Sequence, residues 1–173
     1  MAQLFISDLH LSPARPGIVR IFETFLRGPA QTAGSLYILG DLFEYWAGDD
    51  DVDDAFNTRV ARCLADCSAH GTRIFFMRGN RDFLIGEAFA RAADLQLLDD
   101  PARVDLADGA ALLSHGDMLC TDDIQYMEFR AKVRAPRWAK DFLARPLSER
   151  KAEIEELRAR SESEKSVKPA AVM

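Results

Sequence analysis

Short apolar runs that each end in a polar motif constrain this chain more than any other feature. The runs 4–6, 36–39 and 74–77 have the length of buried strands. The segments 18–26 and 55–69, which lie between them, carry apolar residues at helical spacing. Strands that alternate with helices indicate a parallel sheet covered by helices, so the pattern predicts an α/β fold.

The pattern continues beyond the third run and then changes. A helical segment is expected over 83–92, followed by strands at 95–98, 103–106 and 111–114. The dipeptide Asp108-Gly109 is a hairpin signal between the last two strands. From 122 to 168 the spacing is helical throughout, with breaks at two prolines. We expect this segment to be a helical insertion beside the sheet and not an independent domain.

Metal-binding side chains follow four of the expected strands. Asp8 and His10 follow the first strand, Asp41 the second, Asn80 the third, and His115 a later one. Ligands in open α/β sheets bind beyond the carboxyl ends of the strands, so these loops are expected to meet in one volume. Oxygen and imidazole donors suit manganese, iron or zinc, and Asp41, in the middle of the set, is the natural bridge between two ions.

Each of these residues also has a simpler interpretation. A lone loop histidine is more often hydrogen-bonded than metal-bound, and a lone strand-end aspartate more often caps a turn or a helix. The occurrence of D-x-H, G-D, G-N-R-D and H-G-D in order at four strand ends favours the metal site. Cys63 and Cys67, at helical spacing, are expected to pack as small apolar residues, and His70 is expected to be structural.

The charge of the chain limits its partners. The formal net charge is −6, which disfavours a general nucleic-acid coat because phosphate binding needs a basic face. Residues 1–120 carry 10 basic and 18 acidic side chains, whereas residues 121–173 carry 12 and 10. The three cysteines do not form a disulfide framework, and no apolar run reaches the roughly 20 residues of a membrane span, so we expect a reduced cytoplasmic setting.

Four motifs identify a family resemblance. "SDLHL", "LGDLFE", "RGNRD" and "SHGD" resemble the motifs of the calcineurin-like metallophosphoesterases. The resemblance implies a β-sandwich flanked by helices, with a dinuclear metal centre at the strand ends. "YILGDLFEYWAGDDD" and "HGDMLCTDDIQYMEFR" are further similar to the UDP-2,3-diacylglucosamine diphosphatases of lipid A biosynthesis, over 4–173. That family cleaves the substrate pyrophosphate to UMP and 2,3-diacylglucosamine 1-phosphate with manganese, as a peripheral protein on the cytoplasmic side of the inner membrane.

The resemblance implies roles for particular residues of this chain. It implies two Mn²⁺ ions, with Asp41 bridging them, and places Arg81 at the substrate phosphates, where its planar fork of donors suits a pyrophosphate. The implied metal ligands are Asp8, His10, Asp41, Asn80 and His115. The implied catalytic residues are Asn80, Arg81 and His115, and the implied substrate-binding residues are Asn80, Arg81, Asp123, Ser161, Lys165 and Lys168.

The chain departs from the family pattern at its end. The pattern includes a late Gly-His-x-His motif, and no histidine follows His115 in this sequence. We therefore expect residues 1–173 to be one domain that is C-terminally incomplete, with an unfinished second sheet. The alternatives for its function are another calcineurin-like phosphodiesterase or phosphatase, or an inactive metal-binding remnant.

The helical segment 122–168 has features of a lid over a lipid. Its apolar side chains Trp138, Phe142 and Leu143 are flanked by cations, which suits acyl chains and an anionic membrane surface. Ordinary packing of helices on the sheet would explain the same spacing equally well.

Overall fold

The computed structural model describes residues 1–106 and 109–167, and side chains within these ranges as far as residue 159. Four parallel strands form the main sheet in the order β1-β2-β3-β4. They are β1 (Gln3–Ile6), β2 (Ser35–Leu39), β3 (Arg73–Met77) and β4 (Gln96–Leu98). The predicted α/β fold with a parallel sheet is therefore confirmed.

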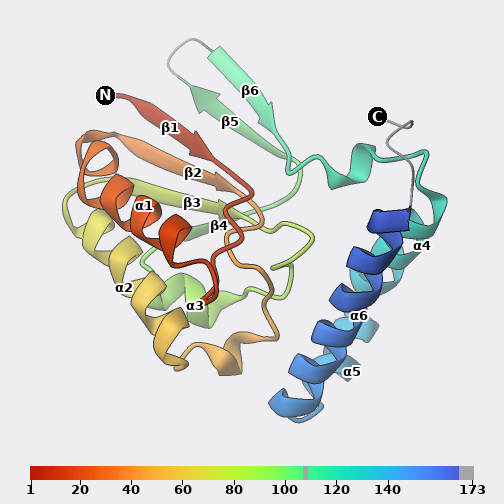
Figure 1. Ribbon diagram of the computed structural model, residues 1–173. Coiled ribbons are helices and arrows are strands. Elements are labelled where there is room, and N and C mark those ends of the chain that lie inside the picture. Colours follow the sequence, from red (N-terminus) through yellow and green to blue (C-terminus); the bar gives the residue numbers. More distant parts are fainter. Residues whose placement is uncertain (107–108, 168–173) are drawn as a thin grey trace.

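Helices α1 (Pro16–Arg27) and α2 (Ala55–Ala69) cover one face of this sheet (Figure 1). Proline stands in the first turn of α1, where its missing N–H costs nothing. The carboxylate of Asp54 caps α2 by accepting the N–H of Phe56 at 2.9 Å. Buried apolar side chains of both helices pack with those of the sheet into one core, so the site loops rest on a rigid base.

Helix α3 (Glu87–Ala92) begins four residues later than the sequence spacing predicts. Its N-terminus is capped from a distant loop, because the carboxylate of Asp49 accepts the N–H groups of Gly86, Ala88 and Phe89. This cap fixes the start of the helix, and residues 83–86 form the turn that leads into it.

Strands β5 (Ala102–Leu106) and β6 (Gly109–Leu113) form a separate antiparallel pair on the side of the sheet opposite α1 and α2 (Figure 1). Three short 3₁₀ segments, Pro29–Thr32, Asp49–Asp51 and Asp117–Leu119, lie in connecting loops. Asp108 of the expected hairpin turn lies outside the described residues.

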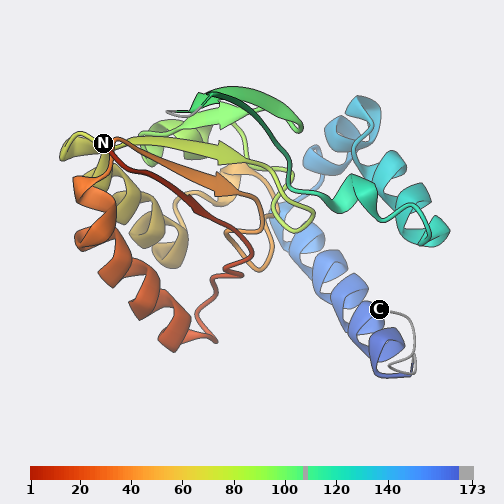
Figure 2. The same ribbon diagram turned by 90° about the horizontal axis from the view of Figure 1, so that it is seen from above.

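The last third of the described chain is helical, as predicted. It contains α4 (Ile124–Val133), α5 (Pro136–Leu143) and α6 (Leu147–Val167), and these helices stand beside the carboxyl ends of the main strands (Figure 2). Breaks fall where the sequence places them, with Pro136 opening α5 and Pro146 directly preceding α6. Among the described helices, none is long and apolar enough to cross a bilayer.

Candidate functional site

The loops after β1 and β2 bring three predicted ligands together. One ligand atom each from Asp8, His10 and Asp41 lies within 4.8 Å of the others. All three residues have a positive φ, of 56°, 49° and 54°. Non-glycine residues seldom adopt this conformation, and it concentrates at functional sites. The backbone therefore accepts strain where the donors converge.

His115 approaches the same volume from the end of β6, in the antiparallel pair and not in the parallel sheet. Its Nδ1 lies 2.8 Å from the carbonyl oxygen of Leu39, which can only accept, so Nδ1 carries the proton. Nε2 then presents a lone pair toward Asn80 Oδ1 at 3.0 Å and Asp41 Oδ1 at 3.8 Å. Three acceptor atoms that face one another in this way suit a cation.

Two glycines allow this close approach. Gly40 has a φ of +92°, and a Cβ there would lie 2.6 Å from Nδ1 of His115. A Cβ at Gly79 would overlap the side chain of Asp41. Side chains at either position would push the site loops apart.

Asp82 ties the loops after β2 and β3 to each other. Its fully buried carboxylate accepts the backbone N–H groups of Gly79 at 2.9 Å, Asp41 at 3.2 Å, Leu42 at 2.7 Å and Phe43 at 3.3 Å. Burial, and after it the neighbouring Asp41 charge, raises the pKa of Asp82 to about 7 despite these hydrogen bonds. Asp82 is thus a clamp for the candidate ligand Asp41.

The donor set fits a divalent cation. Asp41 is only 3 % exposed, and this burial raises the pKa of its carboxyl. The backbone N–H of Arg81 and the nearby imidazoles lower the pKa, but they do not offset the effect of burial. His10 turns Nε2 toward Asp41 Oδ2 at 3.8 Å, whereas its Nδ1 faces Glu44 Oε2 at 4.0 Å. A buried carboxylate and an imidazole nitrogen directed at it both gain from a bound cation. Oxygen and nitrogen donors without thiolates suit manganese, iron or zinc.

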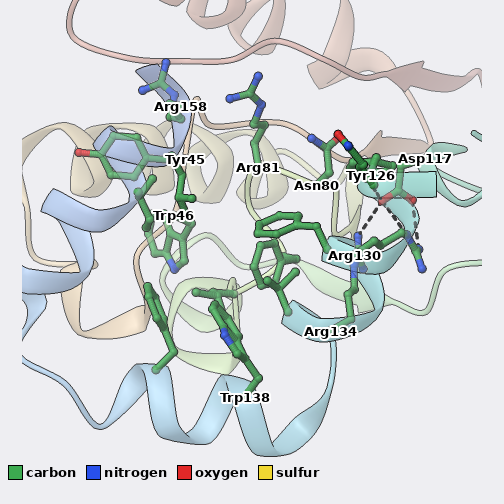
Figure 3. Close-up of a pocket in the computed structure, with 18 of the residues that line it drawn as sticks. Tyr45, Trp46, Asn80, Arg81, Asp117, Tyr126, Arg130, Arg134, Trp138 and Arg158 are labelled. Atoms are coloured by element: carbon green, nitrogen blue, oxygen red, sulfur yellow. Dashed lines mark hydrogen bonds and ion pairs between the residues drawn. The ribbon is translucent and has the colours of Figure 1, made fainter. Parts of the chain in front are cut away.

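A cavity of about 470 Å³ opens between these loops and the helical segment (Figure 3). Asn80 and Arg81 line one part of it, whereas Trp138 lies at the other end. The Arg81 N–H binds Asp41 Oδ1 at 2.8 Å, which fixes the residue next to the donor cluster. The apolar side chains that line the cavity are Trp46, Phe83, Leu84, Phe129, Val133, Trp138, Phe142, Ile154 and Leu157.

A hydrogen-bonded network around Asp117, which the sequence motifs did not predict, joins helix α4 to the site. Asp117 accepts from the Tyr126 hydroxyl at 2.7 Å and from Arg130 Nε at 2.8 Å. Arg134 reaches the Gly79 carbonyl at 3.1 Å. Burial alone would raise the pKa of Asp117, but the hydrogen bonds of Arg130 and Tyr126 outweigh it and lower the pKa. Polar side chains at 126, 130 and 134, four residues apart, were the sequence signal for this face.

The predicted substrate-binding residues are described only in part. Asp123 lines the cavity, and its side chain caps α4 by accepting the Tyr126 N–H at 3.1 Å. Ser161 and Lys165 belong to α6, but their side chains lie outside the described part of the chain. Lys168 also lies outside the described residues.

Comparison with known proteins gives a consistent result. The family model for calcineurin-like phosphoesterases matches residues 1–164. The UDP-2,3-diacylglucosamine hydrolase of Aromatoleum aromaticum is 54 % identical over the whole chain, which spans 70 % of that protein. The hydrolases of the same name from Stenotrophomonas maltophilia K279a and Xanthomonas campestris pv. campestris B100 are 50 % and 48 % identical over 96 % of the chain, which spans 66 % and 67 % of their lengths.

Proposed function

The chain belongs to the calcineurin-like phosphoesterase family, and from this premise we propose that it hydrolyses UDP-2,3-diacylglucosamine. The products are UMP and 2,3-diacylglucosamine 1-phosphate, in lipid A biosynthesis. Relatives of 54 % and 50 % identity carry the name of this activity. The observation in the structure that supports the proposal best is a single cavity that has candidate metal ligands and cationic side chains beside it and an apolar lining.

Two Mn²⁺ ions would occupy the metal centre in this proposal. Asp8, His10, Asp41, Asn80 and His115 would hold them, with Asp41 shared. Bound at this place, a cation pair supplies charge for the phosphoryl oxygens and lowers the pKa of a water. The convergence of Asp8, His10 and Asp41 and the facing acceptors of His115 and Asn80 support these assignments.

The remaining catalytic work falls to side chains that bind and orient the substrate. Arg81 offers two parallel N–H donors to the diphosphate from a backbone position fixed by Asp41. Asn80 contributes its amide beside it, and His115 keeps its Nε2 directed at the reaction centre because Leu39 holds Nδ1. Asp123 at the cavity contacts the glucosamine, and Ser161, Lys165 and Lys168 complete that contact.

The helical segment 122–168 serves as a lid within a single domain. Its apolar side chains Trp138 and Phe142 face the cavity and would receive the acyl chains. Exposed apolar residues on the same segment, Ile124 and Phe129 among them, would contact the lipid surface at the cytoplasmic side of the inner membrane. The peripheral location of the protein follows from this contact.

A substrate comparison tests the proposal. The protein loaded with Mn²⁺ is offered UDP-2,3-diacylglucosamine in detergent micelles, and release of UMP is followed by phosphorus NMR. We expect turnover of this lipid, loss of turnover after chelation, and little turnover of UDP-N-acetylglucosamine, which lacks the second acyl group and long chains. Equal turnover of both sugars would favour a general phosphodiesterase.

A further inference from the structure

Glu44 is the centre of a cluster of ion pairs beside the candidate metal site. It lies on the loop after β2, and its side chain is 17 % exposed. Arg158 Nη2 donates to its Oε1 at 2.6 Å. Arg81 Nη1 lies 3.8 Å from the same oxygen, and Arg15 Nη1 lies 3.9 Å from Oε2. One carboxylate therefore gathers three guanidinium groups.

The three arginines reach Glu44 from separate parts of the chain. Arg15 precedes α1, Arg81 follows β3, and Arg158 belongs to α6. Arg158 is also supported by the ring of Tyr45, whose centroid lies 5.7 Å below its guanidinium. Since this arrangement requires three distant segments to meet, Glu44 is one of the points where the helical segment and the donor loops are joined.

The contacts within the cluster differ in length. Glu44 also faces His10 Nδ1 at 4.0 Å, so its carboxylate is shared among several cationic or polar neighbours. The contacts of Arg81 and Arg15 with Glu44 are longer than a hydrogen bond, so donors of both groups can turn to another acceptor. In Figure 3 the side chains of Arg81 and Arg158 extend in the same direction next to the polar part of the cavity. The arrangement suits a ligand with two negative charges.

We propose that Glu44 is a positioning residue that assembles Arg15, Arg81 and Arg158 into one binding site for the diphosphate of the substrate. The inference rests on the proposed function and adds Arg15, Glu44 and Arg158 to it. The diphosphate of a UDP-sugar carries two negative charges, which suits guanidinium donors of Arg81 and Arg15 that are not in hydrogen-bond contact with Glu44. Arginine can bind each phosphate through two parallel hydrogen bonds.

The roles within the cluster differ. Arg158 has the short bond to Glu44, so it is held in place before any ligand arrives. Arg15, whose side chain is 48 % exposed, contributes from the rim. Glu44 keeps the like charges of the three groups together, which would otherwise repel one another and turn toward solvent.

Binding of UMP to the metal-free protein, measured by calorimetry, tests the cluster without any catalytic step. We expect Arg158→Gln to raise the UMP dissociation constant about tenfold and Arg15→Gln about threefold, since a charged donor to a phosphate is lost. Glu44→Gln should raise it about fivefold, and Glu44→Asp, which keeps the charge, should restore part of the affinity. With the lipid substrate and Mn²⁺, these variants should change KM more than kcat.

Two controls separate the cluster from overall charge and from folding. Arg62→Gln and Asp66→Asn make the same charge changes at exposed positions of α2 and should leave the UMP affinity unchanged. Thermal melts of the Glu44 variants show whether they fold. Uridine, which lacks the phosphate, should bind equally to parent and variants.

Several outcomes would overturn the inference. They are absence of UMP binding to the parent, unchanged affinity in Arg158→Gln, and tighter binding in Glu44→Gln, which would make Glu44 a competitor of the anion. Failure of the parent to hydrolyse UDP-2,3-diacylglucosamine would overturn the proposed function instead. Because UMP binding is measured without metal or lipid, the two failures are distinguishable.

Discussion

Asp41 connects several parts of the candidate site. Its side chain is near Asp8, His10 and His115, and it also accepts the N–H of Arg81. In a nearly buried place without a cation, its charge is costly, as the raised pKa of its carboxyl indicates. A bound cation removes this cost, so Asp41 is the residue with which to test metal binding.

Replacement of Asp41 by asparagine keeps the shape and removes the charge. We expect Asp41→Asn to lower bound Mn²⁺, measured by elemental analysis after dialysis, from about two ions per chain to less than one. The exposed Asp66→Asn serves as the matched control and should keep its metal. Full metal content in Asp41→Asn would rule out the shared-ligand role.

Arg81 allows binding of metal and binding of phosphate to be separated. A guanidinium group does not ligate cations, so Arg81→Lys should keep the parent's Mn²⁺ content. Lysine cannot form the two parallel hydrogen bonds, and we expect the rate of UMP release to fall about 10²-fold. An almost normal rate at full metal content would show that Arg81 does not contact the diphosphate.

Among the helices, α4 is attached to the site through the carboxylate of Asp117. Tyr126 and Arg130 are both bonded to Asp117, and their hydrogen bonds lower its pKa despite burial. A carboxyl whose pKa is lower in the folded state binds fewer protons there than in the unfolded chain. It therefore stabilises the fold above its unfolded pKa, about 3.9, and this contribution is lost as the pH falls through the folded pKa.

The pH dependence of unfolding tests this attachment. In urea titrations at pH 7 and at pH 3, we expect the parent to exceed Asp117→Asn in free energy of unfolding at pH 7, and by less at pH 3. The exposed neighbour Asp122→Asn should track the parent at both values. If the parent and Asp117→Asn differed in free energy of unfolding by the same amount at both pH values, this would contradict the assignment of the lowered pKa to Asp117.

Helix α6 is attached by a buried arginine. Arg150 is 1 % exposed, donates to the carbonyl of Arg145 at 3.0 Å and to that of Ala47, and pairs with Asp50. Its guanidinium occupies the space where a side chain at Gly48 would lie. The loop that contains Ala47 and Asp50 thus anchors the helical segment.

Removal of this anchor should be costly. We expect Arg150→Met to lower the free energy of unfolding by about 2 kcal/mol, because the carbonyl of Ala47 loses its buried donor. The exposed Arg137→Met, on the same segment, is the control and should change it by less than about 0.5 kcal/mol. Equal effects of the two substitutions in urea titrations would show that the anchor does not hold the helices.

Sequence periodicity predicted most helices and strands, because the spacing of apolar residues within a segment shows which of its faces is buried. Helix α2 has the bounds that its apolar spacing predicts. The predicted start of α3 was wrong, because the cap of this helix comes from Asp49, which lies 37 residues before Gly86 in the sequence. Likewise, strand ends pointed to Asp8, His10 and Asp41, whereas the contacts of Glu44 and Asp117 depend on how helices α4 and α6 pack, which no local spacing contains.

For the whole molecule, the main question is whether the helical segment receives acyl chains or only packs on the core. Trp138 stacks on Phe142 at 4.6 Å between ring centroids and lies 6.1 Å from the ring of Phe83, yet it also lines the cavity. Phe142 is 5 % exposed, so its replacement would disturb packing as well as the cavity. Trp138 alone is the better position to change.

Acyl-chain length distinguishes the two roles of Trp138. If the cavity receives the acyl chains, Trp138→Ala should lower kcat/KM for a long-chain substrate about tenfold, because apolar contact with the lipid is lost. A substrate with very short acyl groups makes little of this contact, so its kcat/KM should stay within about twofold of the parent's. Ile21→Ala, a 68 % exposed position on α1 that is not part of the cavity lining, should affect neither substrate. Equal losses on long and short chains, with a lowered melting temperature, would mean that Trp138 only packs the helices, and the apolar lining would no longer support a lipid substrate.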